Sequence, residues 1–206
     1  MRPLAARLAL GFIAFVLVGS GIGGLWVAIA GSYDYEAPRE LADQRTAALT
    51  SAARVLTWAG SAWVLVPLAL LCCALLIRAG LRRDAVAVAV SLGGAMLLSN
   101  IVKLLVSRPR PSVPRLQAVN GSSFPSGHAT QASAFWFSLV LVLQALPVGP
   151  RLLRVAWTLA AMLVAAVAVS RVYLGVHYPS DVLAGVLLGA GWAVFVSRCT
   201  RQPRSP

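Results

Sequence analysis

The sequence predicts an all-α fold, an integral-membrane bundle of six helices with its functional site at the outer membrane surface. Three observations support this prediction. Hydrophobic residues make up 59% of the 206-residue chain and charged residues only 12%, whereas an ordinary soluble domain carries about 25% charged residues. Six stretches without a charged residue are long enough, or nearly long enough, to cross a bilayer. Short clusters of basic residues separate these stretches, as they do between membrane spans.

The expected spans follow from the length of each uncharged stretch, because a helix that crosses the bilayer core needs about 20 mostly apolar residues. Arg171 and Asp181 limit the last two stretches, which are short, so these two side chains are expected close to the membrane surface. The spans need nearly the whole chain, so residues 1–206 are expected to form one membrane domain. The six expected spans cover roughly residues 8–30, 56–77, 85–106, 127–146, 155–170 and 181–197.

The first uncharged stretch has a second interpretation. Arg2 and Arg7, an apolar run and the tripeptide Ala28-Ile29-Ala30 together resemble a secretory signal peptide with its cleavage site. The run is longer than the apolar core of a typical signal peptide, and its removal would leave an odd number of spans. An uncleaved first span is therefore the expectation.

The distribution of basic residues predicts the orientation of the chain. Six spans put both termini on one side, and ten arginines fall on that side against one acidic residue, Asp84. By the positive-inside rule this side is the cytoplasm, so the chain is expected in the inner or plasma membrane with cytoplasmic termini. Residues 31–54 and the 107–126 loop then lie outside. The ten arginines are Arg2, Arg7, Arg78, Arg82, Arg83, Arg151, Arg154, Arg198, Arg201 and Arg204.

Residues 41–56 on the outer side allow two structures. One helical face of this segment would carry only apolar residues, with Arg45 and Arg54 elsewhere on the helix. The segment is therefore either a short helix on the membrane surface or an ordinary solvated connector. The apolar face consists of Leu41, Ala48, Leu49, Ala52 and Leu56.

The net charge of +12 does not indicate a nucleic-acid-binding protein. Its basic residues lie in short clusters between apolar runs and form no continuous basic face, whereas such clusters suit anionic lipid headgroups. The cysteines are expected to act as small apolar residues, and no group of Cys, His, Asp and Glu has the spacing of metal ligands. The sequence thus predicts no cofactor, no metal ion and no nucleic acid; the expected partners are the bilayer and a lipid.

Three polar segments stand at the outer ends of the expected spans, where polar groups are costly and indicate function. They contain the only lysine and both histidines of the chain. Taken singly, they are compatible with snorkelling cations, a histidine at a helix start and a structural His–Asp pair. Taken together, they favour one site. The three segments are Lys103…Arg110-Pro111, Pro125-Ser126-Gly127-His128 and Ser170-Arg171…His177…Asp181.

The cations of these segments suit a phosphoryl group. Arginine binds phosphate oxygens through two parallel hydrogen bonds and lysine adds a point charge, so Lys103, Arg110 and Arg171 are expected to surround one phosphate. Ser126 and Gly127 should begin the fourth helix, whose free backbone N–H groups also bind anions.

The histidines suit phosphoryl transfer. A neutral imidazole is a good nucleophile, so His177 is expected to attack phosphorus while Asp181 holds its other ring nitrogen. His128 is expected to donate a proton to the leaving oxygen and later to accept one from water.

The patterns K-x6-R-P, P-S-G-H and S-R-x5-H-x3-D, in this order, resemble the three signatures of the type-2 phosphatidic-acid phosphatase superfamily. The resemblance implies removal of phosphate from a lipid phosphate or diphosphate without a metal ion. It also implies a phosphohistidine on His177, with His128 as acid and then base. Arg108 falls outside the signatures and remains an auxiliary contact to phosphate. The phosphate-binding positions that the resemblance implies are Lys103, Arg110, Ser126, Gly127 and Arg171.

Several substrates and one other function class stay open at this point. Undecaprenyl diphosphate is slightly favoured, because an outward-facing site suits the recycling of a cell-wall lipid carrier; phosphatidylglycerol phosphate and phosphatidate are the alternatives. The superfamily also contains soluble vanadium haloperoxidases, which six spans disfavour. The other class is a transporter or lipid-binding scaffold that holds an anionic headgroup. A transporter should carry polar groups near the middle of its spans, and these spans carry few.

Overall fold

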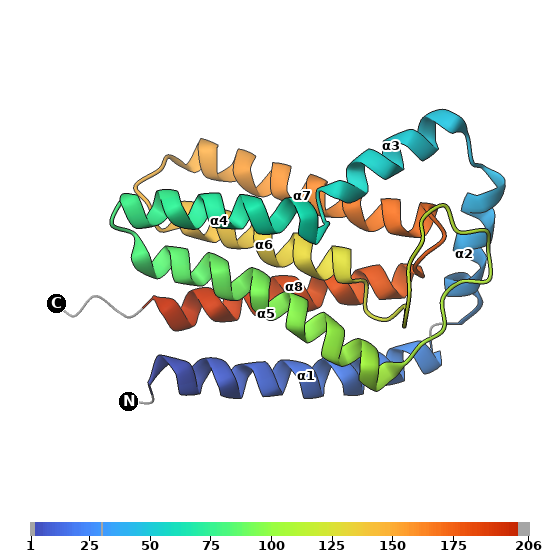
Figure 1. The fold of residues 1–206 in the computed structure, drawn as a ribbon, viewed down its shortest axis with the longest axis horizontal. Coiled ribbons are helices and arrows are strands. Elements are labelled where there is room, and N and C mark those ends of the chain that lie inside the picture. The colour runs from blue at the N-terminus through green and yellow to red at the C-terminus, as the bar shows by residue number, and fades with distance from the viewer. Residues whose placement is uncertain (1–2, 30, 202–206) are drawn as a thin grey trace.

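All secondary-structure elements among the described residues are helices, which confirms the all-α prediction. The structure, a computed structural model, describes residues 3–29 and 31–201 (Figure 1). Arg2, Ala30 and Arg204, to which the sequence interpretation also refers, lie outside these residues. The helices are α1 (Leu4–Ile29), α2 (Gly31–Asp43), α3 (Ala47–Trp58), α4 (Ala62–Arg78), α5 (Arg82–Val106), α6 (Gly127–Gln144), α7 (Pro150–Tyr173) and α8 (Pro179–Thr200).

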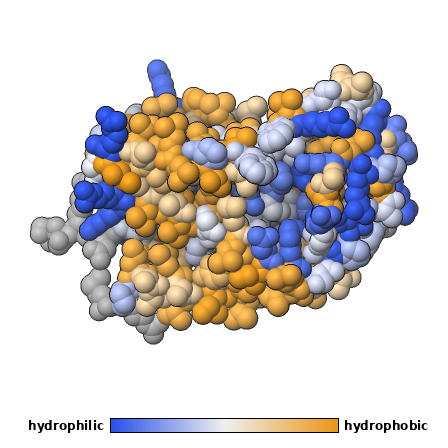
Figure 2. All heavy atoms as spheres, in the orientation of Figure 1, coloured by the Kyte–Doolittle hydropathy of each residue, from blue (hydrophilic) through white to orange (hydrophobic). Residues whose placement is uncertain are grey.

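Helices α1 and α4 to α8 run side by side along the long axis of the molecule (Figure 1). The start of α1, the end of α8 and the α4–α5 turn lie at one end of this bundle, and α2, α3 and the 107–126 loop lie at the other. Apolar residues cover the middle of the face in Figure 2, and polar residues gather toward its ends. This distribution is the one that a bilayer requires of a multi-pass protein.

Helix α6 is the centre of the bundle, because it packs against α4, α5, α7 and α8. Its approach to α8 is close, since a Cβ atom on Gly189 would lie 2.2 Å from the carbonyl oxygen of Thr130. A Cβ atom on Gly185 would lie 2.7 Å from the carbonyl oxygen of Ser126. Small residues at these two positions let the helix backbones meet, and the Ser126 N–H donates to the carbonyl oxygen of Asp181 at 2.9 Å.

Five of the six expected spans have a counterpart among the helices that are long and apolar enough to cross a membrane, although their ends differ. The expected span 127–146 has none, because α6 is not among these helices. Among the described residues there are five such segments: Leu4–Ile29, Ala47–Arg78, Arg82–Val106, Pro150–Tyr173 and Pro179–Thr200. The second of these segments contains both α3 and α4. Helix α4 begins at Ala62, whereas the expected span began at residue 56. Helix α7 extends past the expected 155–170, because its end carries Arg171 into the protein interior, where this side chain is 1% exposed.

Residues 41–56 belong to two helices, which favours the helical interpretation over the solvated connector but divides the segment. Helix α2 ends at Asp43 and α3 begins at Ala47, where the Oγ1 atom of Thr46 accepts the Leu49 N–H. Between them, the guanidinium of Arg45 donates to the carbonyl oxygens of Tyr173, at 3.0 Å, and Pro114, at 2.8 Å. This break therefore ties the outer helices to α7 and to the 107–126 loop.

Candidate active site

The three sequence motifs meet at the end of the bundle that carries α2, α3 and the 107–126 loop (Figure 1). Lys103 stands in the last turn of α5, and Arg171 stands in the last turn of α7. Ser126 caps the start of α6, while His177 and Asp181 flank the start of α8. The motifs thus occupy the ends of four packed helices, so the bundle itself brings them together.

Lys103 joins α5 to the loop that precedes α6. Its Nζ atom donates to the carbonyl oxygens of Pro125 at 2.6 Å, Ser122 at 2.9 Å and Ser123 at 3.4 Å. These neutral acceptors orient the ammonium group without cancelling its charge. The positive charge of Lys103 is therefore held beside the P-S-G-H segment.

Arg110 reaches from the 107–126 loop to the α7–α8 turn. Its Nη1 atom donates to the carbonyl oxygen of Val176 at 2.7 Å and lies 3.5 Å from Nε2 of His177. Its Nε atom donates to the carbonyl oxygen of Gly121 at 3.0 Å. The guanidinium is thus fixed by carbonyl groups next to the ring nitrogen that faces away from Asp181.

Arg171 is held by two residues that the motifs do not contain. Its Nη1 atom donates to Oγ1 of Thr57 at 2.8 Å and to Oε1 of Gln117 at 2.5 Å. Its Nε atom is buried and has no hydrogen-bond partner among the described residues. A buried guanidinium N–H without an acceptor is costly, and an anion in the site would satisfy it.

His177 and Asp181 form the expected pair. The Nδ1 atom of His177 lies 3.4 Å from Oδ2 of Asp181, and that oxygen also accepts the Tyr178 N–H at 2.9 Å. Burial lowers the pKa of His177 to about 4, although the Asp181 carboxylate acts in the opposite direction. The imidazole is therefore neutral near pH 7, and a neutral ring nitrogen is the nucleophilic form.

The turn that presents His177 depends on Gly175. Its φ of +73° lies in the left-handed region, which glycine adopts without steric cost. A Cβ atom there would also lie 2.8 Å from Nη2 of Arg45 and 2.9 Å from the carbonyl oxygen of Pro114. Only glycine fits this turn.

Arg108 lies in a buried ionic network. The sequence suggested instead that its guanidinium makes an auxiliary contact to phosphate. Its Nη1 atom donates to Oδ1 of Asp181 at 2.8 Å, and its Nη2 atom donates to Oδ2 of Asp34 at 2.5 Å. Asp34 also accepts the N–H and the hydroxyl of Ser180. Burial opposes the charged form of Arg108, but the carboxylates of Asp181 and Asp34 outweigh it and raise its pKa.

The P-S-G-H segment begins α6 with a buried cap. Ser126 is fully buried, and its Oγ atom accepts the Ala129 N–H at 3.4 Å. A Cβ atom on Gly127 would meet only ordinary contacts, with Nε2 of Gln131 at 3.7 Å and Cε of Lys103 at 3.9 Å. Packing within the protein therefore does not require glycine at this position. The partly exposed His128 follows directly.

Charged groups gather around His128. Lys103, Arg171 and His177 all lie within electrostatic range of His128. Among the described residues, no group of three His, Cys, Asp or Glu side chains could hold a metal ion. The site therefore consists of cations and two histidines, a combination suited to binding a phosphoryl group and transferring it.

Sequence reasoning missed Asp34, Thr57 and Gln117. Each lies far along the chain from its partner, and no spacing pattern connects them. The only signal was an acidic residue, Asp34, directly after the first apolar stretch.

Comparison with known proteins identifies similar sequences and folds. The sequence model of the PAP2 superfamily matches residues 84–205. The chain is 35% identical over 98 residues to phosphatidylglycerophosphatase B of Bacillus subtilis, covering 47% of this chain and 48% of that protein. It is 42% identical over 101 residues to decaprenylphosphoryl-5-phosphoribose phosphatase of Mycobacterium tuberculosis, and this match covers 47% of this chain and 50% of that protein. The chain therefore spans about half the length of these two curated relatives.

Two further matches cover more of the chain. The undecaprenyl-diphosphatase of Sulfolobus acidocaldarius is 32% identical over 148 residues, which is 67% of this chain and 64% of that protein. The crystal structure of a transmembrane PAP2-type phosphatidylglycerolphosphate phosphatase from Bacillus subtilis superposes with a TM-score of 0.77. It is 25% identical, and the match covers 91% of this chain and 92% of that one.

Proposed function

The chain belongs to the PAP2 superfamily, and from this we propose that it is a membrane phosphatase that hydrolyses a lipid phosphate or diphosphate. One observation carries the proposal: Arg110 and Asp181 hold the two ring nitrogens of His177 at the end of the bundle where Lys103 and Arg171 also lie. The names of the relatives, which are phosphatases of lipid phosphates, support the same class of reaction.

The proposed reaction has two steps. In the first, Nε2 of His177 attacks phosphorus, the bond from phosphorus to the leaving oxygen breaks, and His128 donates a proton to that oxygen. In the second, His128 takes a proton from water while the water oxygen attacks phosphorus. The phosphorus–nitrogen bond then breaks and inorganic phosphate leaves. Asp181 stabilises the positive charge that His177 acquires in the intermediate.

The cations stabilise the charge that develops on the phosphoryl oxygens. Lys103 and Arg110 are fixed by carbonyl groups before substrate arrives, so little reorganisation accompanies the reaction. Arg171 contributes a buried Nε–H that still needs an acceptor. The Ser126 and Gly127 segment adds the N-terminus of α6.

Arg108 and Asp34 are positioning residues in this proposal. Arg108 donates to Oδ1 of Asp181, whereas Oδ2 of Asp181 faces His177. Asp34, which belongs to α2, in turn accepts a hydrogen bond from Arg108. The carboxylate of Asp181 is thereby held in one orientation toward the Nδ1 atom of His177.

For membrane placement, we propose that residues 1–206 form one domain in which α1 and α4 to α8 are six spans. Helix α6, which is less apolar than the others, then crosses the bilayer inside the ring of its neighbours. The arginine distribution favours cytoplasmic termini in the inner or plasma membrane and an outward-facing site. Undecaprenyl diphosphate is the favoured substrate among lipid phosphates, ahead of phosphatidylglycerol phosphate and phosphatidate.

The test is phosphate release by the purified protein in detergent, with these three lipids compared and excess EDTA present. Turnover should persist in EDTA, because the proposal uses no metal ion, and vanadate should inhibit as a mimic of the transferring phosphoryl group. His177→Gln serves as the inactive control. Binding of all three lipids without phosphate release would overturn the phosphatase and favour a lipid-binding scaffold. Loss of turnover in EDTA, restored by magnesium, would overturn the metal-free mechanism.

A further inference from the structure

The guanidinium of Arg171 uses only part of its hydrogen-bonding capacity within the protein. It carries five N–H groups in one plane, one on Nε and two on each Nη atom. The Nη1 atom has an acceptor for each of its two hydrogens, Oγ1 of Thr57 at 2.8 Å and Oε1 of Gln117 at 2.5 Å. The Nε–H has no partner among the described residues, although Arg171 is only 1% exposed. Thr57 and Gln117 thus occupy one end of the guanidinium and leave its Nε–H without an acceptor.

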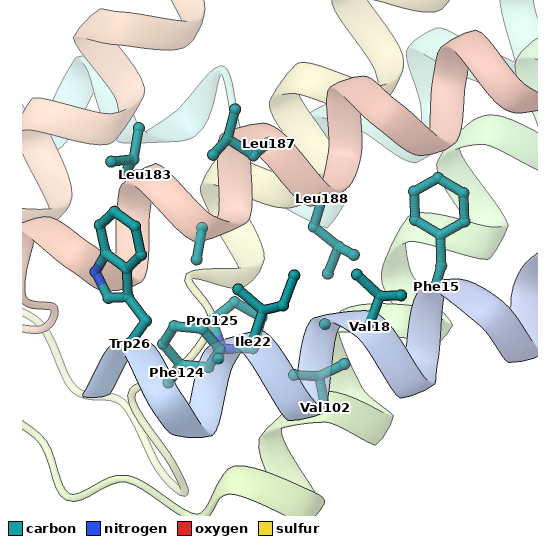
Figure 3. A pocket seen from close by; sticks show the side chains of 13 residues that line it. Phe15, Val18, Ile22, Trp26, Val102, Phe124, Pro125, Leu183, Leu187 and Leu188 are labelled. Atoms are coloured by element: carbon teal, nitrogen blue, oxygen red, sulfur yellow. The ribbon is translucent and has the colours of Figure 1, made fainter. Parts of the chain in front are cut away.

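The Nε edge of this guanidinium suits a phosphoryl group. Its Nε–H and the adjacent hydrogen of Nη2 are parallel and can donate to two oxygens of one phosphate. Arg171 lies within electrostatic range of Lys103, His128 and His177, which belong to the candidate site. None of the described residues that line the pocket between α1, α5 and α8 is charged (Figure 3), so an anion finds its cations at the motif site. A phosphate oxygen there would supply the acceptor that the Nε–H lacks.

Thr57 brings helix α3 into the site. It is buried in the last turn of α3 and stands 114 positions before Arg171 in the chain. The turn that follows packs against the same region, because a Cβ atom on Gly60 would lie 3.0 Å from the carbonyl oxygen of His128. Thr57 precedes residues 84–205, which match the superfamily model. Helix α3 therefore adds to the site a contact that lies outside the family signatures.

Gln117 brings the 107–126 loop to the same nitrogen atom. The backbone just before it is fixed, because the Leu116 N–H donates to the carbonyl oxygen of Leu174 at 3.0 Å. This hydrogen bond attaches the loop to the turn after α7. The half-buried side chain of Gln117 extends from this fixed backbone, so its Oε1 atom is held at the end of the helix that carries Arg171.

Both acceptors are neutral, which distinguishes Arg171 from Arg108. A hydroxyl and an amide oxygen fix Nη1 without cancelling the positive charge of the guanidinium. Arg108, in contrast, donates to the carboxylates of Asp34, at 2.5 Å, and Asp181, at 2.8 Å, which neutralise its charge. Such carboxylates beside Arg171 would compete with phosphate for its donors. The surroundings of Arg171 therefore keep its charge for an anionic ligand.

We propose that Thr57 and Gln117 are positioning residues for the phosphoryl group of the substrate. By holding Nη1, they orient Arg171 so that its Nε–H and one Nη2–H donate to two phosphate oxygens. The inference rests on the proposed phosphatase function and adds two residues that the three motifs do not contain. It also gives α3 and the 107–126 loop a part in substrate binding.

The experiment removes each acceptor while keeping the size of the side chain. Thr57→Val replaces the hydroxyl by a methyl group, whereas Thr57→Ser retains the hydroxyl. Gln117→Met retains the length of the side chain without its amide. The matched control, Gln144→Met, makes the same change at the exposed far end of α6. For each variant, the Kd of orthovanadate is measured by calorimetry in detergent, and kcat and KM are measured with a lipid phosphate.

Thr57→Val and Gln117→Met should each raise the Kd of vanadate and the KM for the lipid by about tenfold. A tenfold change corresponds to about 1.4 kcal/mol, which does not exceed the value of one hydrogen bond to a charged group. Thr57→Ser and Gln144→Met should stay within about twofold of the wild type. A purely structural defect would instead reduce the fraction of folded protein, which lowers the apparent kcat and leaves Kd and KM unchanged.

A double-variant cycle tests whether the two residues act through Arg171. Arg171→Lys retains a positive charge but lacks the fork of two parallel N–H groups, so it should itself weaken vanadate binding. In this background, Thr57→Val and Gln117→Met should cause no further loss, because the group that they orient is gone. Fully additive losses, or an unchanged vanadate Kd in both single variants, would overturn the positioning role. An equal loss in Thr57→Ser or in Gln144→Met would overturn it as well.

Vanadate binding separates this inference from the proposed function. If the wild type binds vanadate but releases no phosphate from any lipid, the phosphatase function is wrong, while the vanadate Kd values still test Thr57 and Gln117. Failure of the wild type to bind vanadate would overturn the inference itself.

Discussion

Replacement of Asp34 by asparagine should destabilise the protein by about 3 kcal/mol, although the two side chains have nearly the same shape. The Asp34 carboxylate accepts from Nη2 of Arg108 with one oxygen and from the Ser180 N–H with the other. Asparagine offers one acceptor oxygen, so its amide NH₂ group must face one of these donors. The change thus removes a hydrogen bond to a charged group, worth about 1.5–3 kcal/mol, and leaves a buried donor unsatisfied at a cost of about 1–3 kcal/mol.

Thermal unfolding in detergent measures this effect. A loss of 1 kcal/mol lowers the Tm of a chain of this length by about 2–4 °C, so Asp34→Asn should lower it by about 6–12 °C. The matched control is Asp43→Asn, at the exposed end of the same helix, which should change stability by less than about 0.5 kcal/mol. A Tm for Asp34→Asn within about 1 °C of the wild type would refute the buried Asp34–Arg108 pair.

The same variant separates positioning from binding. Asp34 reaches His177 through Asp181, which it holds by way of Arg108 and of the neighbouring Ser180, so kcat should fall while KM for the lipid stays near the wild-type value. In an Arg108→Gln background, Asp34→Asn should lower kcat by a smaller factor than in the wild type, because one of its two partners is gone while Ser180 remains. Additive losses in the double variant would show that Asp34 does not act through Arg108.

Three further predictions concern orientation, protonation and the two histidines. In a cysteine-free background, a cysteine at Ser112 should react with an impermeant thiol reagent in intact cells; labelling only after lysis would reverse the proposed topology. The pKa of His177 in the folded protein, about 4, lies below its ordinary value of 6.5, so the unfolded chain takes up the proton first. Stability should therefore fall as the pH drops from about 6.5 to about 4, and His177→Gln should flatten this dependence; an unchanged slope would contradict the buried neutral imidazole. His128→Ala should slow the first step about 10²–10⁴-fold on a lipid monophosphate but clearly less on an activated aryl phosphate, whose leaving group needs no proton. Equal losses in the burst phase on both substrates, or labelled phosphate trapped on His177→Ala, would show that the roles are assigned wrongly.

The ends of the helices were harder to predict than their existence. Uncharged stretches locate the spans, because a charged side chain in hydrocarbon is costly. A helix, however, continues through the membrane surface as long as its backbone hydrogen bonds are made, so α7 runs from Pro150 to Tyr173 and includes Arg151, Arg154 and Arg171. Counting between charges therefore made the expected spans 155–170 and 181–197 too short at both ends.

The all-α membrane class and the set of candidate site residues follow from the sequence, because both depend on local patterns: runs of apolar residues and short spacings between polar ones. The surroundings of those residues depend on the packing of distant helices. The Asp34–Arg108–Asp181 network joins residues more than 70 positions apart, and Thr57 lies 114 positions from Arg171. Such contacts depend on how closely whole helices pack, which glycines such as Gly189 and Gly23 permit, and no local pattern specifies which distant side chain then fills the space.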